Sequence, residues 1–201
     1  TIGSFYIWKF AGFDDDGNFL LYNKDGEVIP AEKKTENDKQ FIGNYTPKLI
    51  LGWNNTFSYK NFDLGINMRS WIDFDVYNTI NMYYGIQGRG NTNVLKEAYG
   101  KFNHIKGEKQ ICDYYLEDGT FLKIDAITLG YTLNVKKYTN NLVDRIRVYA
   151  TVGNVCTITG YSGMNPEVNI TGWDQGTEKF WDTGSFYPMA RTYTLGMQFN
   201  F

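Results

Sequence analysis

Histidine and cysteine are scarce in this sequence, with one histidine and two cysteines among 201 residues. The single histidine, His104, excludes multi-histidine metal sites and most catalytic sites built on histidine. No paired nucleophile and base emerge from the sequence, so we predict no enzyme activity, no catalytic residue, no metal and no cofactor. Cys112 and Cys156 form no CxxC motif. Two free thiols are expected, and a disulfide between them is the alternative.

The sequence also lacks an excess of one charge and a long apolar run. Its 20 basic and 22 acidic residues give a net charge of −2. Nucleic-acid binding requires clustered positive charge, so no nucleic-acid partner is expected. No apolar run reaches the roughly 18 residues that a transmembrane helix needs. A transmembrane β-strand needs only about 10 residues of alternating polarity, so a membrane-spanning barrel stays open.

Proline is rare as well, whereas 21 Gly, 16 Tyr and 14 Phe favour strands joined by turns. The clearest pattern closes the sequence, where Tyr193, Leu195, Met197, Phe199 and Phe201 alternate with small or polar residues. Such period-2 alternation predicts a strand with one apolar and one polar face.

The same alternation recurs along the chain, more weakly at its start. We predict six strands, near residues 2–11, 48–59, 61–72, 120–133, 143–155 and 189–201. Only Lys60 and Asn61 separate the second run from the third, which indicates a tight hairpin.

The predicted connections are long at one end of the strands, over 12–47, 73–119 and 157–188, and short at the other. Loops longer than about 15 residues are uncommon in compact domains. Outer-membrane barrels, in contrast, combine long outer loops with short periplasmic turns and have aromatic girdles near strand ends. We therefore predict an all-β fold, an antiparallel up-and-down transmembrane β-barrel. A soluble β-sandwich that binds carbohydrate is the alternative, because alternation alone fits both architectures.

Six strands are too few to close a membrane barrel, whose smallest form has about eight. The sequence also begins at Thr1 with no Met and no signal segment. We therefore expect this chain to be a fragment or segment of a longer barrel.

Five stretches of the sequence resemble one family, the SusC/RagA-like TonB-dependent outer-membrane transporters. They follow the order of that family's C-terminal portion and cover nearly the whole chain. The stretches are IGSFY with KFAGFD (2–14), IGN with PK and FSYKNFDL (42–64), DGTFLK with TLGYTL (118–133), VYATVGN with YSG and NPEV (148–168), and YP with RTYTLG (187–196).

The resemblance implies that this chain supplies about the last six strands of a barrel of about 22 strands. It implies a transporter that imports oligosaccharides or peptides across the outer membrane of a Gram-negative bacterium. The implied partners are a SusD-like surface lipoprotein that acts as a lid, the rest of the barrel with its N-terminal plug, TonB through the missing N-terminal part, and membrane lipid. The C-terminus would lie on the periplasmic side.

Aromatic residues in or beside the long connections are the candidates for contact with substrate or lid, because flat rings stack on sugars. They are Trp71, Tyr83, Tyr84, Trp173, Trp181 and Phe186. The alternative is that these rings only pack the loops against one another.

A second set of candidates shares the polar face of the predicted strands. Asn67, Arg69, Arg145, Arg147 and Tyr149 are expected to line the lumen. They would contact cargo or, as the alternative, form a charge network against the plug. On the apolar face of the last strand, we interpret Tyr193, Phe199 and Phe201 as the barrel-assembly signal.

Two acidic stretches, at 14–18 and 23–27, invite a calcium interpretation. They fail the EF-hand pattern, because Phe19 stands at the required Gly and Asp25 at the final Glu. We predict turns of a small outer β-meander there instead.

Overall fold

The computed structural model describes residues 3–87, 92–140, 142–168, 181–182 and 189–201. The chain divides into two compact units, each taken by itself below. The sheet unit comprises Leu49–Ile72, Phe121–Thr159 and Pro188–Phe201, and the loop unit comprises Thr1–Lys48, Asp73–Thr120 and Gly160–Tyr187. In the described part of the chain, no helix combines the length and the apolar composition needed to cross a membrane.

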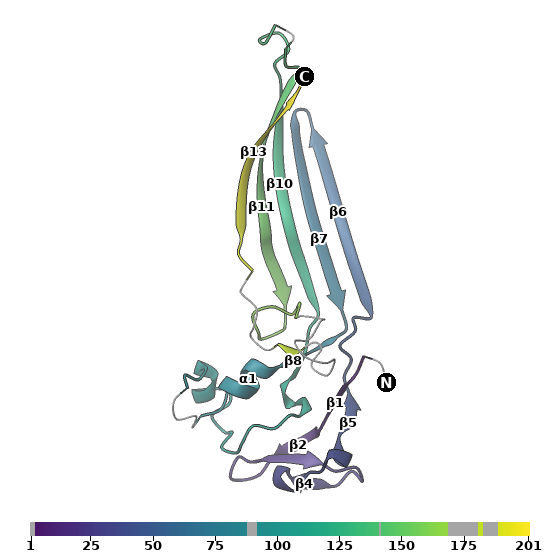
Figure 1. Ribbon diagram of the computed structural model, residues 1–201, viewed down its shortest axis with the longest axis vertical. Helices are drawn as coiled ribbons and strands as arrows, with labels where there is room; N and C mark the ends of the chain where they lie inside the picture. Colours follow the sequence, from purple (N-terminus) through teal and green to yellow (C-terminus); the bar gives the residue numbers. More distant parts are fainter. Residues whose placement is uncertain (1–2, 88–91, 141, 169–180, 183–188) are drawn as a thin grey trace. The chain divides into compact units, whose positions relative to one another are not determined.

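The sheet unit is one five-stranded antiparallel sheet in which each strand lies beside its neighbour in the unit's chain order (Figure 1). Its strands are β6 (Leu49–Tyr59), β7 (Phe62–Ile72), β10 (Phe121–Asn134), β11 (Arg145–Thr159) and β13 (Thr192–Asn200). Each of them lies over one of the alternating runs of the sequence. The up-and-down order is the one expected for part of a meandering barrel wall.

The first alternating run differs from the expectation of a sixth barrel strand over 2–11. The structure divides it between β1 (Phe5–Ile7), which pairs with β5 (Gln40–Ile42), and β2 (Lys9–Phe13), which pairs with β3 (Phe19–Tyr22). The reason is packing: the core of the loop unit buries Ile7 and also its neighbour Trp8, which breaks the period of two.

The pairing register sorts the side chains of the sheet onto two faces. One apolar row crosses all five strands, through Tyr59, Phe62, Tyr131, Val148 and Met197. The apolar face is exposed among the residues that the structure describes: on β13, Tyr193 is 74% exposed and Leu195 is 84% exposed. Exposed apolar patches of this extent mark a contact surface for lipid or protein.

Hydrogen bonds and a left-handed residue shape the described parts of both short connections, 60–61, 135–140 and 142–144. Lys60 closes the β6–β7 hairpin in the left-handed region, with φ of 52°. In the turn between β10 and β11, the backbone N–H of Val135 donates to the Asp144 carbonyl at 3.1 Å. Thr139 braces the same turn, because its hydroxyl donates to the Val143 carbonyl at 2.8 Å.

The loop unit has its own small sheets and one short helix. β3 also pairs with β4 (Val28–Pro30), which makes β2, β3 and β4 the small meander expected from the sequence. A second sheet joins β8 (Asp75–Asn78) to β9 (Leu116–Asp118) and β12 (Trp181–Asp182), and α1 (Thr79–Tyr84) follows β8. Short 3-10 helices span Ala31–Lys33, Glu36–Asp38, Lys96–Tyr99 and Asp113–Tyr115. The three long connections therefore fold together as one unit.

Aromatic rings form the centre of the loop unit. Tyr77 is fully buried and stacks on Trp181 with 4.6 Å between ring centroids. Its hydroxyl accepts the Cys112 backbone N–H at 3.1 Å and approaches the Met82 sulfur at 3.5 Å. Both cysteines are free thiols, and burial raises the pKa of the Cys112 thiol to about 12.

Tyr77 and Tyr115 offer a matched pair of tests, because both rings are buried but only the Tyr77 hydroxyl has hydrogen-bond partners among the described atoms. Tyr77→Phe leaves the Cys112 N–H unpaired and is expected to cost about 1–3 kcal/mol. Tyr115→Phe removes an unpaired hydroxyl and is expected to be neutral or stabilising. Protease resistance of the loop unit in the intact protein measures both, and equal losses would contradict this account.

Candidate functional site

An ion pair crosses the polar face of the sheet. The Arg147 guanidinium on β11 binds Asp63 on β7 through both carboxylate oxygens, with Nε at 2.9 Å from Oδ1. The strand between them, β10, presents Gly130 at this position, directly opposite Asp63. A Cβ atom on Gly130 would overlap both partners of the ion pair. Glycine is therefore required at position 130, because the Asp63–Arg147 pair passes directly over β10.

Tyr149 repeats this arrangement one strand further along. Its ring lies over Gly196 of β13, where a Cβ atom would overlap the ring and the hydroxyl. The Arg147 guanidinium lies 5.0 Å from the centre of the same ring, within the range of a cation–π contact. Asp63, Arg147 and Tyr149 thus form one connected group on the polar face.

A second ion pair depends on an irregularity of β10. Asp125 is the residue at which the register shifts, between Ile124 and Ala126. Its carboxylate binds Arg69 Nε on β7 at 3.1 Å. Beside it, Lys123 is 2% exposed and lies opposite Arg69. The bulge concentrates charged side chains on one part of the sheet.

The register places the five expected lumen residues on this polar face. It brings Arg147 and Tyr149 into contact, and sets Asn67 and Arg69 two residues apart on β7. Arg145 stands at the strand end, opposite Asn134. Sequence reasoning missed their acidic partners, Asp63 and Asp125. Opposite charges on one face were a usable signal for Asp63, but the bulge that places Asp125 left no sequence signal.

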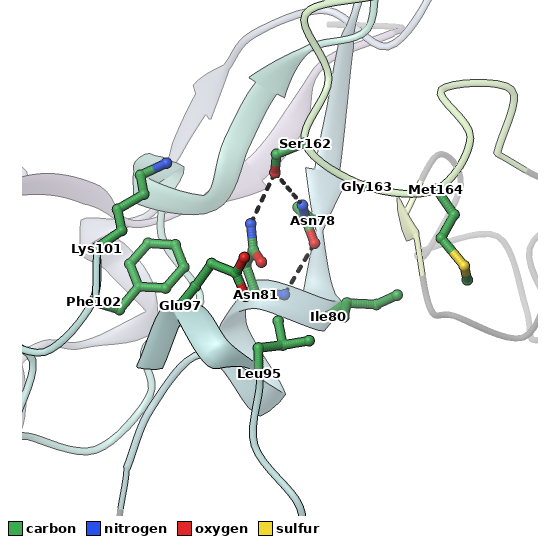
Figure 2. Close-up of a pocket in the computed structure, with 10 residues that line it drawn as sticks. All are labelled: Asn78, Ile80, Asn81, Leu95, Glu97, Lys101, Phe102, Ser162, Gly163 and Met164. Atoms are coloured by element: carbon green, nitrogen blue, oxygen red, sulfur yellow. Dashed lines mark hydrogen bonds between the residues drawn. The ribbon is translucent and has the colours of Figure 1, made fainter. Parts of the chain in front are cut away.

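A cavity of about 300 Å³ lies in the loop unit, where α1 begins (Figure 2). Asn78 caps this helix by accepting the Asn81 backbone N–H at 3.0 Å. The side-chain amides of Asn78 and Asn81 both donate to the Ser162 hydroxyl, at 3.1 Å each. Both amides also donate to Glu117, which accepts the Ser162 N–H at 2.8 Å. The polar side of the cavity is therefore held rigidly by hydrogen bonds.

The rest of the cavity is apolar, apart from two opposite charges. It is lined by Ile80, Leu95, Phe102 and Met164, with Gly163, and by Glu97 and Lys101. Neither Glu97 nor Lys101 forms an ion pair with any residue that the structure describes. An apolar surface with a few fixed polar groups is the usual composition of a small-ligand site.

Of the expected aromatic contact residues, the four that the structure describes do not line this cavity. Tyr83 and Tyr84 are exposed at the end of α1, and Lys109 lies 3.8 Å from the centre of the Tyr83 ring. Trp181 packs on Tyr77 in the loop unit, and Trp71 lies in β7 at 5.6 Å from the Phe121 ring. Trp173 and Phe186 lie outside the described residues. The cavity residues were missed because asparagine and serine are common in turns.

In the acidic stretch at 14–18, a carboxylate accepts hydrogen bonds from backbone N–H groups of the same stretch. The Asp14 carboxylate accepts the N–H groups of Asp16 and Asn18 at 3.0 and 2.8 Å, together with the Asn18 side-chain amide. These bonds, led by that of the Asn18 side chain, lower the pKa of Asp14. Across the described ranges, no group of three or more His, Cys, Asp or Glu residues is placed to hold a metal ion.

Comparison with curated proteins finds TonB-dependent receptors. The chain is 27% identical to TonB-dependent receptor P3 of Formosa agariphila, over all of this chain and 22% of that receptor. It is 28% identical to the TonB-dependent receptor SusC of Bacteroides thetaiotaomicron, over 98% of this chain and 19% of SusC. The chain thus spans about a fifth of the length of these relatives. No family model matches the sequence.

Solved structures show the same architecture. The chain matches the RagAB peptide importer in its open-open state with a TM-score of 0.74 and 22% identity, over 98% of this chain and 22% of that one. Another structure of the RagAB peptide transporter gives a TM-score of 0.72 at 20% identity. The resemblance to the SusC/RagA-like TonB-dependent receptors is confirmed. The chain has the fold of the part of the transporter that it matches in the RagAB structures.

The flat ion pair predicts a strong difference between two glycines on the polar face. Gly130→Ala is expected to displace the Asp63–Arg147 pair. The overpacking should lower the free energy of unfolding by about 1–3 kcal/mol. Gly65→Ala, where a Cβ meets nothing within 4 Å, is the matched control and is expected to be neutral. The measurement is the temperature at which the folded barrel loses its heat-modifiable mobility on gels. Equal effects of Gly130→Ala and Gly65→Ala would contradict this account. It would also be contradicted if Gly130→Ala destabilised the Arg147→Ala variant as much as it destabilises the unmodified protein.

Proposed function

We propose that this chain is the C-terminal part of the barrel of a TonB-dependent outer-membrane importer. The observation that carries the proposal is the two-faced sheet: an exposed apolar face, and a polar face that holds ion pairs. Barrel strands in the outer membrane have this distribution, apolar toward lipid and polar toward the lumen. In this assignment Asn67, Arg69, Arg145, Arg147 and Tyr149 face the lumen.

The connections support an orientation for this barrel. The two short ones, Lys60-Asn61 and 135–144, lie at the same end of the sheet as Phe201 (Figure 1). Short turns belong on the periplasmic side of outer-membrane barrels. We therefore assign the C-terminus to the periplasm and the loop unit to the cell exterior.

Cargo and partners follow from the relatives by analogy. RagAB is a peptide importer, and SusC is a TonB-dependent receptor. We assign this chain's protein a SusD-like lid lipoprotein, an N-terminal plug that couples to TonB, and an oligosaccharide or peptide cargo. The cavity beside α1 and the exposed Tyr83 and Tyr84 are the surfaces offered to cargo or lid. Because the relatives are named as receptors and transporters, no catalytic role is assigned.

The full-length protein tests this assignment against the soluble β-sandwich. We expect it to fractionate with the outer membrane, to require detergent after extraction and to co-purify with a surface lipoprotein. Cells that lack it are expected to lose uptake of one cargo from a panel of glycans and peptides. A monomer that stays soluble without detergent and melts cooperatively would establish the sandwich alternative instead.

The closing aromatic residues give a prediction about assembly. Tyr193, Phe199 and Phe201 share the apolar face, and Phe201 is 86% exposed. We expect Phe201→Ala to lower the amount of heat-modifiable barrel in the outer membrane, because the assembly machinery would read this aromatic end. Leu195→Ala, on the same face but further from the end, is the control and is expected to assemble normally. Unchanged assembly of Phe201→Ala would refute the signal.

A further inference from the structure

The turn between β10 and β11 exposes apolar side chains at the end of the sheet. Tyr138 is 88% exposed and Leu142 is 73% exposed. The turn is nevertheless ordered by internal bonds, including the Lys136–Asp144 ion pair at 3.0 Å. Asp144 also ties the turn to the last strand, because its N–H donates to the Asn200 carbonyl at 2.8 Å. A tyrosine and a leucine held exposed at the end of the sheet form a surface suited to insertion into an apolar layer.

Aromatic residues at the neighbouring strand ends continue this surface. Phe62 and Tyr131 pack together with 4.6 Å between ring centroids, on the apolar face. Tyr59 is exposed beside the hairpin, with Lys60 Nζ at 5.3 Å from its ring centre. Aromatic rings of this kind occupy the boundary between hydrocarbon and headgroups, because one end of the ring is apolar and the other polar.

The same end of the sheet is basic. Residues 59–62, 131–146 and 199–201 contain Lys60, Lys136, Lys137 and Arg145 but only one acidic side chain, Asp144. Asp144 forms an ion pair with Lys136. Lys60 and Lys137 therefore have no carboxylate partner among the described residues. The sheet unit as a whole has eight basic and three acidic side chains, whereas the loop unit has 12 basic and 19 acidic. The sheet unit therefore has a net positive charge, whereas the loop unit has a net negative charge.

We propose that residues 135–140 and 142–144 of this turn form a membrane anchor: Tyr138 and Leu142 enter the boundary of the inner leaflet, and Lys137 and Lys60 each contact the phosphates of anionic phospholipid headgroups. The proposal rests on the barrel assignment and its orientation. Charge complementarity selects the occupant, because exposed apolar groups beside unpaired lysines fit an anionic lipid surface. A periplasmic protein is the competing occupant, which the first experiment below separates from lipid.

Photo-crosslinking identifies what covers the turn. The full-length protein with p-benzoylphenylalanine at position 138 is irradiated in cells, purified and analysed by mass spectrometry. We expect a phospholipid adduct at this position, and none when the same amino acid replaces the exposed Tyr99 of the loop unit. A protein adduct at position 138, or no adduct of either kind, would overturn the proposal. Loss of membrane association altogether would instead refute the barrel assignment.

Lipid retention tests the lysines. The detergent-purified protein is exposed to equal amounts of phosphatidylglycerol and phosphatidylcholine, and the bound lipid is counted by native mass spectrometry. We expect preferential retention of phosphatidylglycerol, reduced about fivefold by each of Lys137→Gln and Lys60→Gln. Lys33→Gln, an exposed lysine of the loop unit, is the control and should change nothing. Equal retention of both lipids, or no effect of Lys137→Gln and Lys60→Gln, would overturn the headgroup assignment while leaving the barrel intact.

Discussion

A sheet with one apolar and one polar face must satisfy two different surroundings at once, and every other feature of the sheet unit depends on this constraint. In the apolar row through Tyr59, Phe62 and Tyr131, Tyr59 and Phe62 are exposed. On the opposite face, Arg147 binds a carboxylate two strands away, across β10, and Arg69 binds a carboxylate on the adjacent strand. Because both of these ion pairs join different strands, they also stiffen the sheet that carries them.

The loop unit solves a separate problem, which is how long connections acquire a core. Segments that are far apart in the sequence meet around Tyr77, Trp181 and Cys112. The first helical turn of α1 and Ser162 come from different connections, and Glu117 ties them together. A cavity assembled from separate segments can vary in each of them independently.

The sequence was sufficient to predict the five long strands, because period-2 alternation over nine or more residues is hard to mistake. It misled at residues 2–11, where the pattern is short and the loop-unit core overrides it by burying Trp8. The lumen candidates follow from the polar face, but the pairing of Arg69 with Asp125 depends on a bulge that no sequence periodicity reveals. The cavity beside α1 was invisible for another reason: its residues come together only through tertiary contacts between segments.

Gly130 links three positions that are distant in sequence and lie on three different strands. With Asp63 and Arg147 in place, no larger residue fits at position 130. If either charged partner is replaced by a small residue, the space above β10 opens and a side chain larger than glycine fits at position 130. Among related barrels, these three positions are therefore expected to change together, so that a bulky residue at 130 accompanies the loss of the ion pair from the polar face.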